Sequence, residues 1–328
     1  MFWQILFRSL IAQNTWQTTL EFAALLVLPA LGGVISERSG VVNIAMEGMM
    51  LVGAFASVMV TLAMHNLGMS NFLSVLIGTI AAMLAGGLLS LIHATVSVNF
   101  KANQIVSGIA INLIGLGLTS YLVYVLTPAG QGVPSLPGNL RLPTPNLGPL
   151  ASIPWIGPVL FQQNLIFYVA ILILIGTQFF LFRTNLGLRV RAVGEHPQAA
   201  DTAGVNVRLV RYLCVLTSGL FSGLSGAYLA LGVAGIFNPG MTDGRGFIAL
   251  AAMIFGRYNP LGAALGCLIF GLGDGLAIPL QDLQPNSSNL SNILNALPYI
   301  LTLIALVGLV GRTTPPAADG IPYDPGSE

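Results

Sequence analysis

The chain has 328 residues, and only 7% of them are Asp, Glu, Lys or Arg, against about 25% in a typical globular protein. Hydrophobic residues make up 55% and the mean hydropathy is +0.83, so the composition excludes a water-soluble protein and predicts an all-α, polytopic membrane protein. The net charge is +1, with Lys+Arg 12 against Asp+Glu 11, which leaves no basic excess for phosphates and excludes a nucleic-acid partner.

Stretches of about 20 apolar residues can cross about 30 Å of hydrocarbon, and the hydropathy pattern gives a series of candidate helices. They lie near residues 16–36, 41–64, 71–98, 103–126, 163–182, 209–232, 245–256, 260–281 and 293–311. The segment 245–256 is too short to cross comfortably alone, so we expect a broken helix or one that continues into the loop before it. The pattern predicts a bundle of about 8 to 10 transmembrane helices in a single domain over residues 16–311.

The segments outside these spans differ in composition. Residues 1–15 contain Arg8 and no small-residue cleavage site, which indicates an interfacial lead-in helix and not a signal peptide. Prolines are frequent between Thr127 and Pro158, so we expect an extended external loop over 127–162. Residues 312–328 combine prolines with acidic residues and are expected to form a loose cytoplasmic tail.

Orientation follows from the distribution of Lys and Arg. Five of the 12 cations lie within residues 183–211, which assigns that loop to the cytoplasm. Counting spans outward from it puts four more cations on the same side, namely Arg38, Lys101, Arg257 and Arg312. Arg8, Arg141 and Arg245 are then external, as is the N-terminus if all the candidate helices cross.

Residue spacing argues against several chemistries. The only lysine, Lys101, follows no glycine-rich loop, so no Walker-type ATPase motif is present. His65 and His93 are isolated from other plausible ligands, and Cys214 and Cys267 are far apart in apolar stretches, so no metal site or redox pair is predicted. No His or Asp pairs with a Ser, a Cys or a second ligand at a suitable spacing, which disfavours an intramembrane enzyme.

Glycine repeats occur within the spans. Gly219-x-x-x-Gly223 and Gly262-x-x-x-Gly266 predict close packing of helices. The run Gly271-x-Gly273-x-Gly275 resembles a fragment of a dinucleotide-binding loop, but no strand precedes it. We therefore interpret it as a packing motif too.

The cytoplasmic loop has the features of a docking site. Pro197 suits the first turn of a helix, and a short helix would run from it through residue 202 and end at Gly204. The exposed face of that helix is small, so a groove on another protein could close over it. The alternative is a solvated, positively charged loop that lies on the membrane.

Four segments carry a family resemblance. Residues Arg183 to Gly204 match the pattern GLxxRAxGxxxxAAxxxG and resemble the coupling segment of the inner-membrane permeases of ABC importers for branched-chain amino acids, ribose-type sugars and nucleosides. The segments from Leu28 to Ala54, from Asn103 to Leu113 and from Gly246 to Gly262 are similar to the simple-sugar and nucleoside branch of that family. The proline-rich loop and the tail carry no such resemblance.

The resemblance implies one half of a transmembrane pair in a bacterial-type cytoplasmic membrane. Its partners would be an ABC ATPase subunit, a second permease subunit that is homologous or identical, and an extracytoplasmic substrate-binding protein. The chain would bind no cofactor, since ATP and Mg would be used by the ATPase. The ATPase-coupling residues implied are Arg191, Gly194, Glu195, His196, Pro197, Ala199, Ala200 and Gly204.

Polar residues within the spans are candidates for the substrate pathway, because ionisable groups there are costly and usually face the bundle interior. Glu47 and Asp274 are the clearest cases, and the spacing to Asn43 would put it on one helix face with Glu47. The helix after Lys101 contributes Asn103, Ser107 and Asn112, and Phe247 could contact the ring of a substrate. The alternative is that these groups satisfy the backbone of broken helices or hold neighbouring helices together.

The leading hypothesis is half of the translocation pathway for nucleosides or simple sugars, working by alternating access. Two alternatives stay open at this level. One is an ABC permease for branched-chain amino acids. The other is an ion-coupled secondary transporter in which Glu47 and Asp274 would bind a proton or a cation.

Overall fold

A computed structural model of the chain describes residues 11–127, 132–145, 147–283 and 314–325. The helices are α2 (Gln13–Glu37), α3 (Met46–Asn66), α4 (Asn71–Ala94), α5 (Gln104–Leu126), α6 (Ile156–Phe161), α7 (Leu165–Arg183), α8 (Asn185–Glu195), α9 (Pro197–Thr202), α10 (Val207–Ala227), α11 (Arg245–Phe255) and α12 (Pro260–Leu283). Two π-helical segments, η1 (Thr95–Asn99) and η3 (Tyr228–Ala234), extend α4 and α10, and a 3-10 turn, η2 (Gly148–Ser152), precedes α6. Within the described ranges only an isolated bridge between Ser135 and Ile236 has β geometry, which confirms the all-α class.

Among the described residues, 7 helices are long and apolar enough to cross a membrane. These are α2, α3, α4 with η1, α5, α7, α10 with η3, and α12. The short segment near 245–256 is α11, with 11 residues, a length of about 16 Å that cannot span hydrocarbon. The predicted helix at 293–311 and residues 1–10 of the predicted lead-in helix lie outside the described residues.

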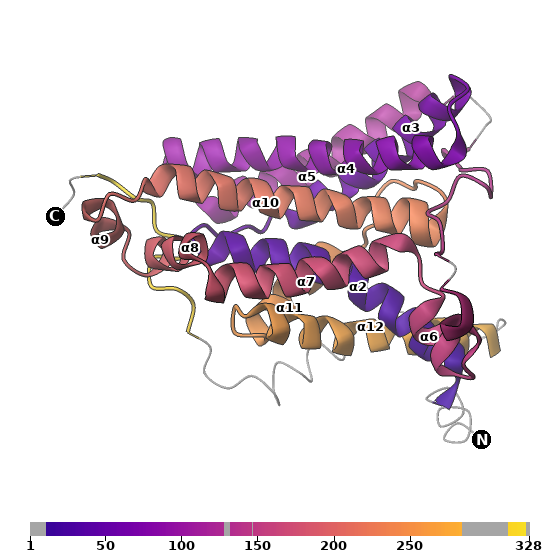
Figure 1. Cartoon of the computed structure of the whole chain (residues 1–328). Helices are drawn as coiled ribbons and strands as arrows, with labels where there is room; N and C mark the ends of the chain where they lie inside the picture. Colours follow the sequence, from indigo (N-terminus) through magenta and orange to yellow (C-terminus); the bar gives the residue numbers. More distant parts are fainter. Residues whose placement is uncertain (1–10, 128–131, 146, 284–313, 326–328) are drawn as a thin grey trace.

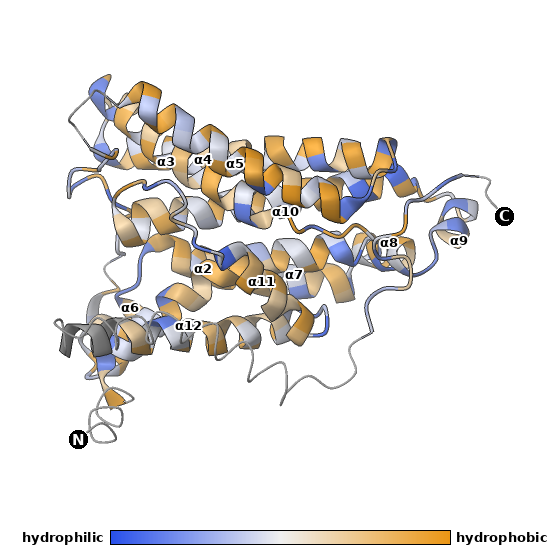
Figure 2. Ribbon diagram, turned by 180° about the vertical axis from the view of Figure 1, so that it is seen from behind, coloured by the Kyte–Doolittle hydropathy of each residue, from blue (hydrophilic) through white to orange (hydrophobic). Residues whose placement is uncertain are grey.

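The central helix of the bundle is α2, which packs against α10, α11, α12 and α7. Its most apolar 18-residue window is 83% buried, whereas the corresponding window of α5 is 22% buried. Figure 2 shows hydrophobic residues along the long helices and hydrophilic residues gathered around α8 and α9 and in loops at the opposite end. The apolar surfaces of the outer helices are therefore available to lipid or to another membrane subunit.

The glycines of α10 confirm the predicted close helix packing. A Cβ atom added to Gly219 would meet Gly86 O at 2.5 Å, and one added to Gly223 would meet the backbone of Ala82. The axes of α10 and α4 can approach this closely only because neither glycine carries a side chain. The same holds for Gly271 of α12, where a Cβ would lie 2.6 Å from Thr19 O.

One helix boundary differs from the sequence prediction. We expected a helix from residue 41, but residues 38–45 are not helical and α3 begins at Met46. Gly40 has a φ of 86°, in the left-handed region that ends helices and favours glycine. Asn43 therefore precedes α3, and the prediction that it shares a helix face with Glu47 is wrong.

The two ends of the bundle separate the loops as the charge pattern predicts (Figure 1). At one end, Arg38 Nε donates a hydrogen bond to Tyr258 O at 2.8 Å, and Lys101 Nζ lies 2.6 Å from Asp324 Oδ1. The segment that contains α8 and α9 lies at this end too, whereas α6 lies at the other. Arg141 lies beside Gly235, which follows η3 at the end of α10 that is remote from α9. Arg245 is an exception, because it lies inside the bundle and not on the external side as predicted.

The prediction of a loose tail is wrong for the residues that the structure describes. Residues 314–325 run across the end of the bundle that carries α8 and α9 (yellow in Figure 1). Ala318 is 6% exposed and Tyr323 is 7% exposed. Composition suggested a solvated segment, but the side chains of Pro316, Ala318 and Tyr323 are buried against other parts of the chain.

Membrane sidedness can be tested by thiol labelling. Asn139 and Thr144 are exposed at the end opposite α9, and Gln198 is exposed on α9. Both native cysteines are buried, so their background labelling is expected to be low. In whole cells, an impermeant maleimide should label Asn139→Cys and Thr144→Cys but not Gln198→Cys. Labelling of Gln198→Cys alone would show that the chain has the opposite orientation in the membrane.

Candidate substrate pathway and coupling surface

Two non-helical segments, 38–45 and 235–244, lie within the bundle. Asn43 Nδ2 donates to Ser218 Oγ at 2.8 Å, and Ser218 lies about 17 Å along α10 from its first residue. A Cβ on Gly240 would lie 3.7 Å from Leu116 of α5, a residue about 18 Å along that helix. Non-helical backbone at membrane depth is tolerated only where protein covers it or where it lines a water-filled cavity.

Side chains from α4 and α5 satisfy the backbone of segment 38–45. The Val42 N–H donates to Gln104 Oε1 at 2.7 Å, and His93 Nε2 donates to Val42 O at 2.9 Å. Asn112 donates to Ile44 O at 2.9 Å, and it also accepts at 2.8 Å from the N–H of Gly48 in the first turn of α3. These bonds replace the helical hydrogen bonds that the segment lacks.

His93 is the clearest member of this network. A carbonyl oxygen only accepts, so Nε2 carries the proton, and in the neutral ring Nδ1 accepts from Ser107 Oγ at 3.0 Å. Both ring nitrogens are therefore engaged. Ser107 and Asn112, both predicted candidates for the substrate pathway, instead hold the non-helical segment in place in this structure.

Glu47 joins the two non-helical segments. Its Oε1 accepts from the Gly244 N–H at 2.9 Å, and its Oε2 accepts from the Gly246 N–H at 2.6 Å. Gly244 precedes the first residue of α11, so the carboxylate satisfies free N–H groups at the positive end of that helix. A Cβ added to Gly246 would lie 2.5 Å from the backbone nitrogen of Glu47, and the absence of a side chain there permits the contact.

Asp274 is paired across the bundle. Its Oδ1 lies 3.5 Å from Arg245 Nη2, and the two side chains are 16% and 18% exposed. The Arg245 guanidinium also lies over the Phe22 ring, 5.2 Å from its centroid. Charges in a bundle interior are usually paired in this way. Sequence reasoning missed the partner because it assigned Arg245 to the external side, at the start of the candidate helix 245–256.

Segment 235–244 and the start of α11 form an exposed surface at membrane depth. Asn238 and Asp243 are exposed, and Phe247, one residue after the Gly246 contact to Glu47, is 46% exposed. Discontinuous helices of this kind form the binding sites of many transporters. Asn103 lies elsewhere, at the start of α5, where its Oδ1 accepts from the N–H groups of Ile105 and Val106.

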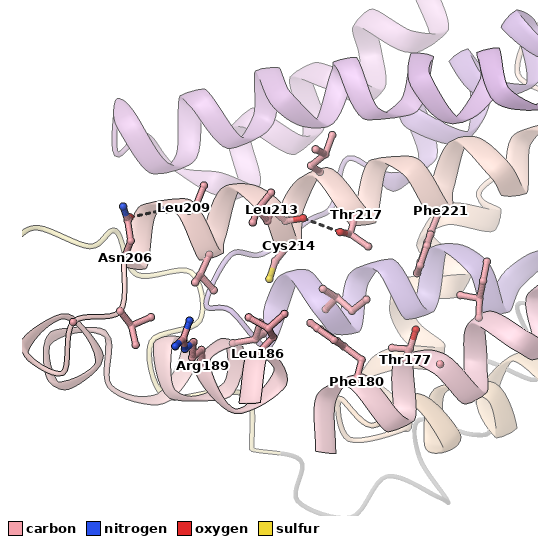
Figure 3. Close-up of a pocket in the computed structure, with 18 residues that line it drawn as sticks. Thr177, Phe180, Leu186, Arg189, Asn206, Leu209, Leu213, Cys214, Thr217 and Phe221 are labelled. Atoms are coloured by element: carbon pink, nitrogen blue, oxygen red, sulfur yellow. Dashed lines mark hydrogen bonds between the residues drawn. The ribbon is translucent and has the colours of Figure 1, made fainter. Parts of the chain in front are cut away.

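A separate cavity of about 760 Å³ lies between α7 and α10, near α8 (Figure 3). Most of its lining is apolar, including Phe180, Leu209, Leu213 and Phe221, and Ile35 of α2 contributes as well. None of the candidate pathway residues lines it. The cavity is thus distinct from the surface around Glu47 and Phe247.

The predicted short helix at 197–202 is α9, and α8 precedes it. Thr184 Oγ1 caps α8 by accepting from the Gly187 N–H at 3.0 Å. Gly204, with a φ of 83°, follows α9, and its N–H donates to Asp201 O at 2.8 Å. Proline at the start and glycine after the end thus produce the helix that the sequence predicts.

The candidate coupling residues divide into an exposed and a covered set. Glu195, His196, Ala199 and Gly204 are exposed, Arg191 is half-buried, and Gly194, Pro197 and Ala200 are buried. A Cβ on Gly194 would collide with the backbone of Arg38, so Gly194 holds α8 against segment 38–45. Arg191 lies over the Phe182 ring at 5.2 Å. The exposed set is what remains available to another protein.

Comparison with known proteins shows the family to which the chain belongs. Residues 17–308 match the family model described as branched-chain amino acid transport system / permease component. The chain belongs to this family. It is therefore a permease component and a multi-pass protein of the cytoplasmic membrane, as the resemblance implied.

The relatives of this permease include transporter subunits from bacteria and archaea. It is 45% identical to the guanosine ABC transporter permease protein NupQ of Bacillus subtilis, over 79% of this chain and 80% of the relative. It is 42% identical to a nucleoside ABC transporter permease protein of Lactococcus lactis, over 79% and 80% of the two chains. Identity to a putative glucose ABC transporter permease protein of Haloferax volcanii is 37%, over 83% and 79%.

Proposed function

We propose that this permease forms one half of the translocation pathway of an ATP-driven importer for nucleosides or simple sugars. A separate ABC ATPase subunit would hydrolyse ATP with Mg, a second permease subunit would complete the pathway, and an extracytoplasmic protein would deliver substrate. The chain itself needs no cofactor for this role. Relatives named for guanosine, nucleoside and glucose transport support the substrate class.

The observation that carries the proposal is the contact between the coupling segment and the pathway. The exposed face of α9 offers Ala199 and neighbouring small residues to a partner, while Gly194 of α8 packs on the backbone of Arg38. Segment 38–45 leads from that contact directly to Glu47 at the start of α3. An ATPase that contacts α9 differently in its two nucleotide states would thereby shift the surface around Glu47.

The geometry disfavours an ion-coupled secondary transporter. Glu47 is engaged by two backbone N–H groups, and Asp274 is paired with Arg245. Neither carboxylate is free to bind and release a cation or proton without breaking these contacts. Among the comparisons described above, the relatives named for nucleosides and sugars also favour those substrates over branched-chain amino acids.

Reconstitution tests the proposal. The complete transporter in proteoliposomes should take up radiolabelled nucleosides or sugars in an ATP-dependent manner and should not take up leucine. The permease alone under a proton or sodium gradient should give no uptake. Gradient-driven uptake by the permease alone would contradict the proposal and support a secondary transporter. Selective uptake of leucine would contradict the proposed substrate class and support a permease for branched-chain amino acids.

A further inference from the structure

The C-terminal segment 314–325 contacts both the coupling segment and the membrane bundle. It crosses the end of the molecule that carries α8 and α9 (Figure 1). A tail with no role beyond solubility would not be expected to make backbone and side-chain bonds to two separate structural units. Its contacts therefore join the coupling segment to the bundle.

The contacts with the coupling segment are specific. The Ala318 N–H donates to Gly194 O at 2.9 Å, and the Tyr323 hydroxyl donates to Asp201 Oδ2 at 2.7 Å. The Tyr323 ring, 7% exposed, packs in one cluster with Val193, Ala200 and Val207. The tail thus completes a small apolar core under α8 and α9.

The contacts with the bundle centre on Arg211 of α10, which is 1% exposed. Its Nη1 donates to Ile321 O at 3.0 Å, and its Nε donates to Ser39 O at 3.2 Å. One guanidinium therefore links the tail to segment 38–45. An ion pair between Lys101 and Asp324 adds little, because both side chains are partly exposed to solvent.

Asp319 inserts a carboxyl group beside the end of α2. It interacts with the carboxyl group of Glu37, which is 3% exposed. Burial raises the pKa of Asp319 to about 6, although the interactions with Glu37 and with the Arg211 charge act in the opposite direction. Removal of the tail would leave Glu37 and Arg211 without these partners, which is costly for buried groups.

The coupling segment needs such support. The helix α9 has 6 residues, too few to be stable by itself, and it makes few contacts with α10. Its buried residue Ala200 lies against the tail residue Tyr323. Movement of α9 can reach segment 38–45 through α8 and through the tail, and also through α10, whose Arg211 donates to Ser39 O.

We propose that residues 314–325 act as a brace that transmits movement of α8 and α9 to segment 38–45, with Tyr323 and Arg211 as positioning residues. The inference rests on the proposed function as an ATP-driven permease. Without the brace, the ATPase still docks and hydrolyses ATP, but fewer substrate molecules are transported per ATP hydrolysed. Coupling between the two activities falls while binding is preserved.

The test uses the complete reconstituted transporter and measures ATP hydrolysed per substrate transported. Tyr323→Ala, and deletion of residues 314–328, should raise this ratio roughly tenfold, within the usual range of coupling factors. Tyr323→Phe keeps the ring and should recover most of the coupling. Ile321→Ala is the matched control, because Ile321 is 56% exposed and contributes its backbone carbonyl to Arg211.

The outcomes separate the brace from the proposed function. An unchanged ratio in both Tyr323→Ala and the deletion would overturn the brace alone. Loss of ATPase co-purification in Tyr323→Ala would also overturn it, since the tail would then build the docking surface. If the wild-type transporter shows no ATP-dependent uptake, the proposed function fails and the brace fails with it.

Discussion

Glu47→Gln is expected to lower ATP-dependent uptake about 10- to 100-fold. The carboxylate accepts from the N–H groups of Gly244 and Gly246, whereas a glutamine amide presents one oxygen and an NH₂ group that cannot accept. Hydrogen bonds to a charged group contribute about 1.5–3 kcal/mol, and each 1.4 kcal/mol is a factor of ten. Uptake by the reconstituted complex is the measurement.

Two controls accompany Glu47→Gln. Glu47→Asp keeps the charge on a shorter side chain and should retain more uptake than the glutamine variant. Co-purification with the ATPase should be unaffected in both, because Glu47 lies within the bundle and not on the exposed face of α9. Wild-type uptake by Glu47→Gln would show that the contact between α3 and α11 is not needed for transport.

Ala199→Trp is expected to abolish both ATPase co-purification and uptake while leaving membrane insertion intact. Ala199 is exposed on α9, and an indole ring there would hold apart two surfaces that meet over small side chains. Because the side chain points to solvent in the isolated chain, the substitution creates no clash within the permease. Pull-down of the tagged ATPase and uptake assays measure the two effects.

The matched control for Ala199→Trp is Asn139→Trp, which adds the same ring at an exposed position on the opposite end. It should preserve ATPase binding. Gly194→Trp is unsuitable as a docking test, because even a Cβ at Gly194 collides with the Arg38 backbone and would disturb the fold. Normal ATPase binding and uptake by Ala199→Trp would show that α9 is a solvated connector and not a docking site.

The long spans and the short helix α9 were predictable because their determinants are local. Apolar runs of sufficient length predict membrane helices, and α2, α5 and α7 follow from them. Pro197 and Gly204 bound α9 through backbone preferences that each residue carries wherever it stands. The charge distribution likewise places the loops at the two ends.

The chemistry of the candidate site was not predictable in the same way. His93, Gln104 and Asn112 satisfy the backbone of segment 38–45 from far along the chain, so an apolar sequence that reads as helix is held in another conformation. Candidate pathway residues such as Asn112 could be identified from the sequence. Whether their side chains bond to backbone groups or are available to a substrate depends on which segment lies beside them in the fold.

What the sequence by itself determined is therefore the membrane class, the positions of most spans and the short helix α9, because hydropathy and turn preferences act over a few neighbouring residues. The tertiary structure alone decided that Asp274 pairs with Arg245 and that Tyr323 packs under Ala200. These contacts join residues distant in sequence. Their partners are selected by the packing of the whole bundle, since a buried polar group must find a partner wherever the fold provides one.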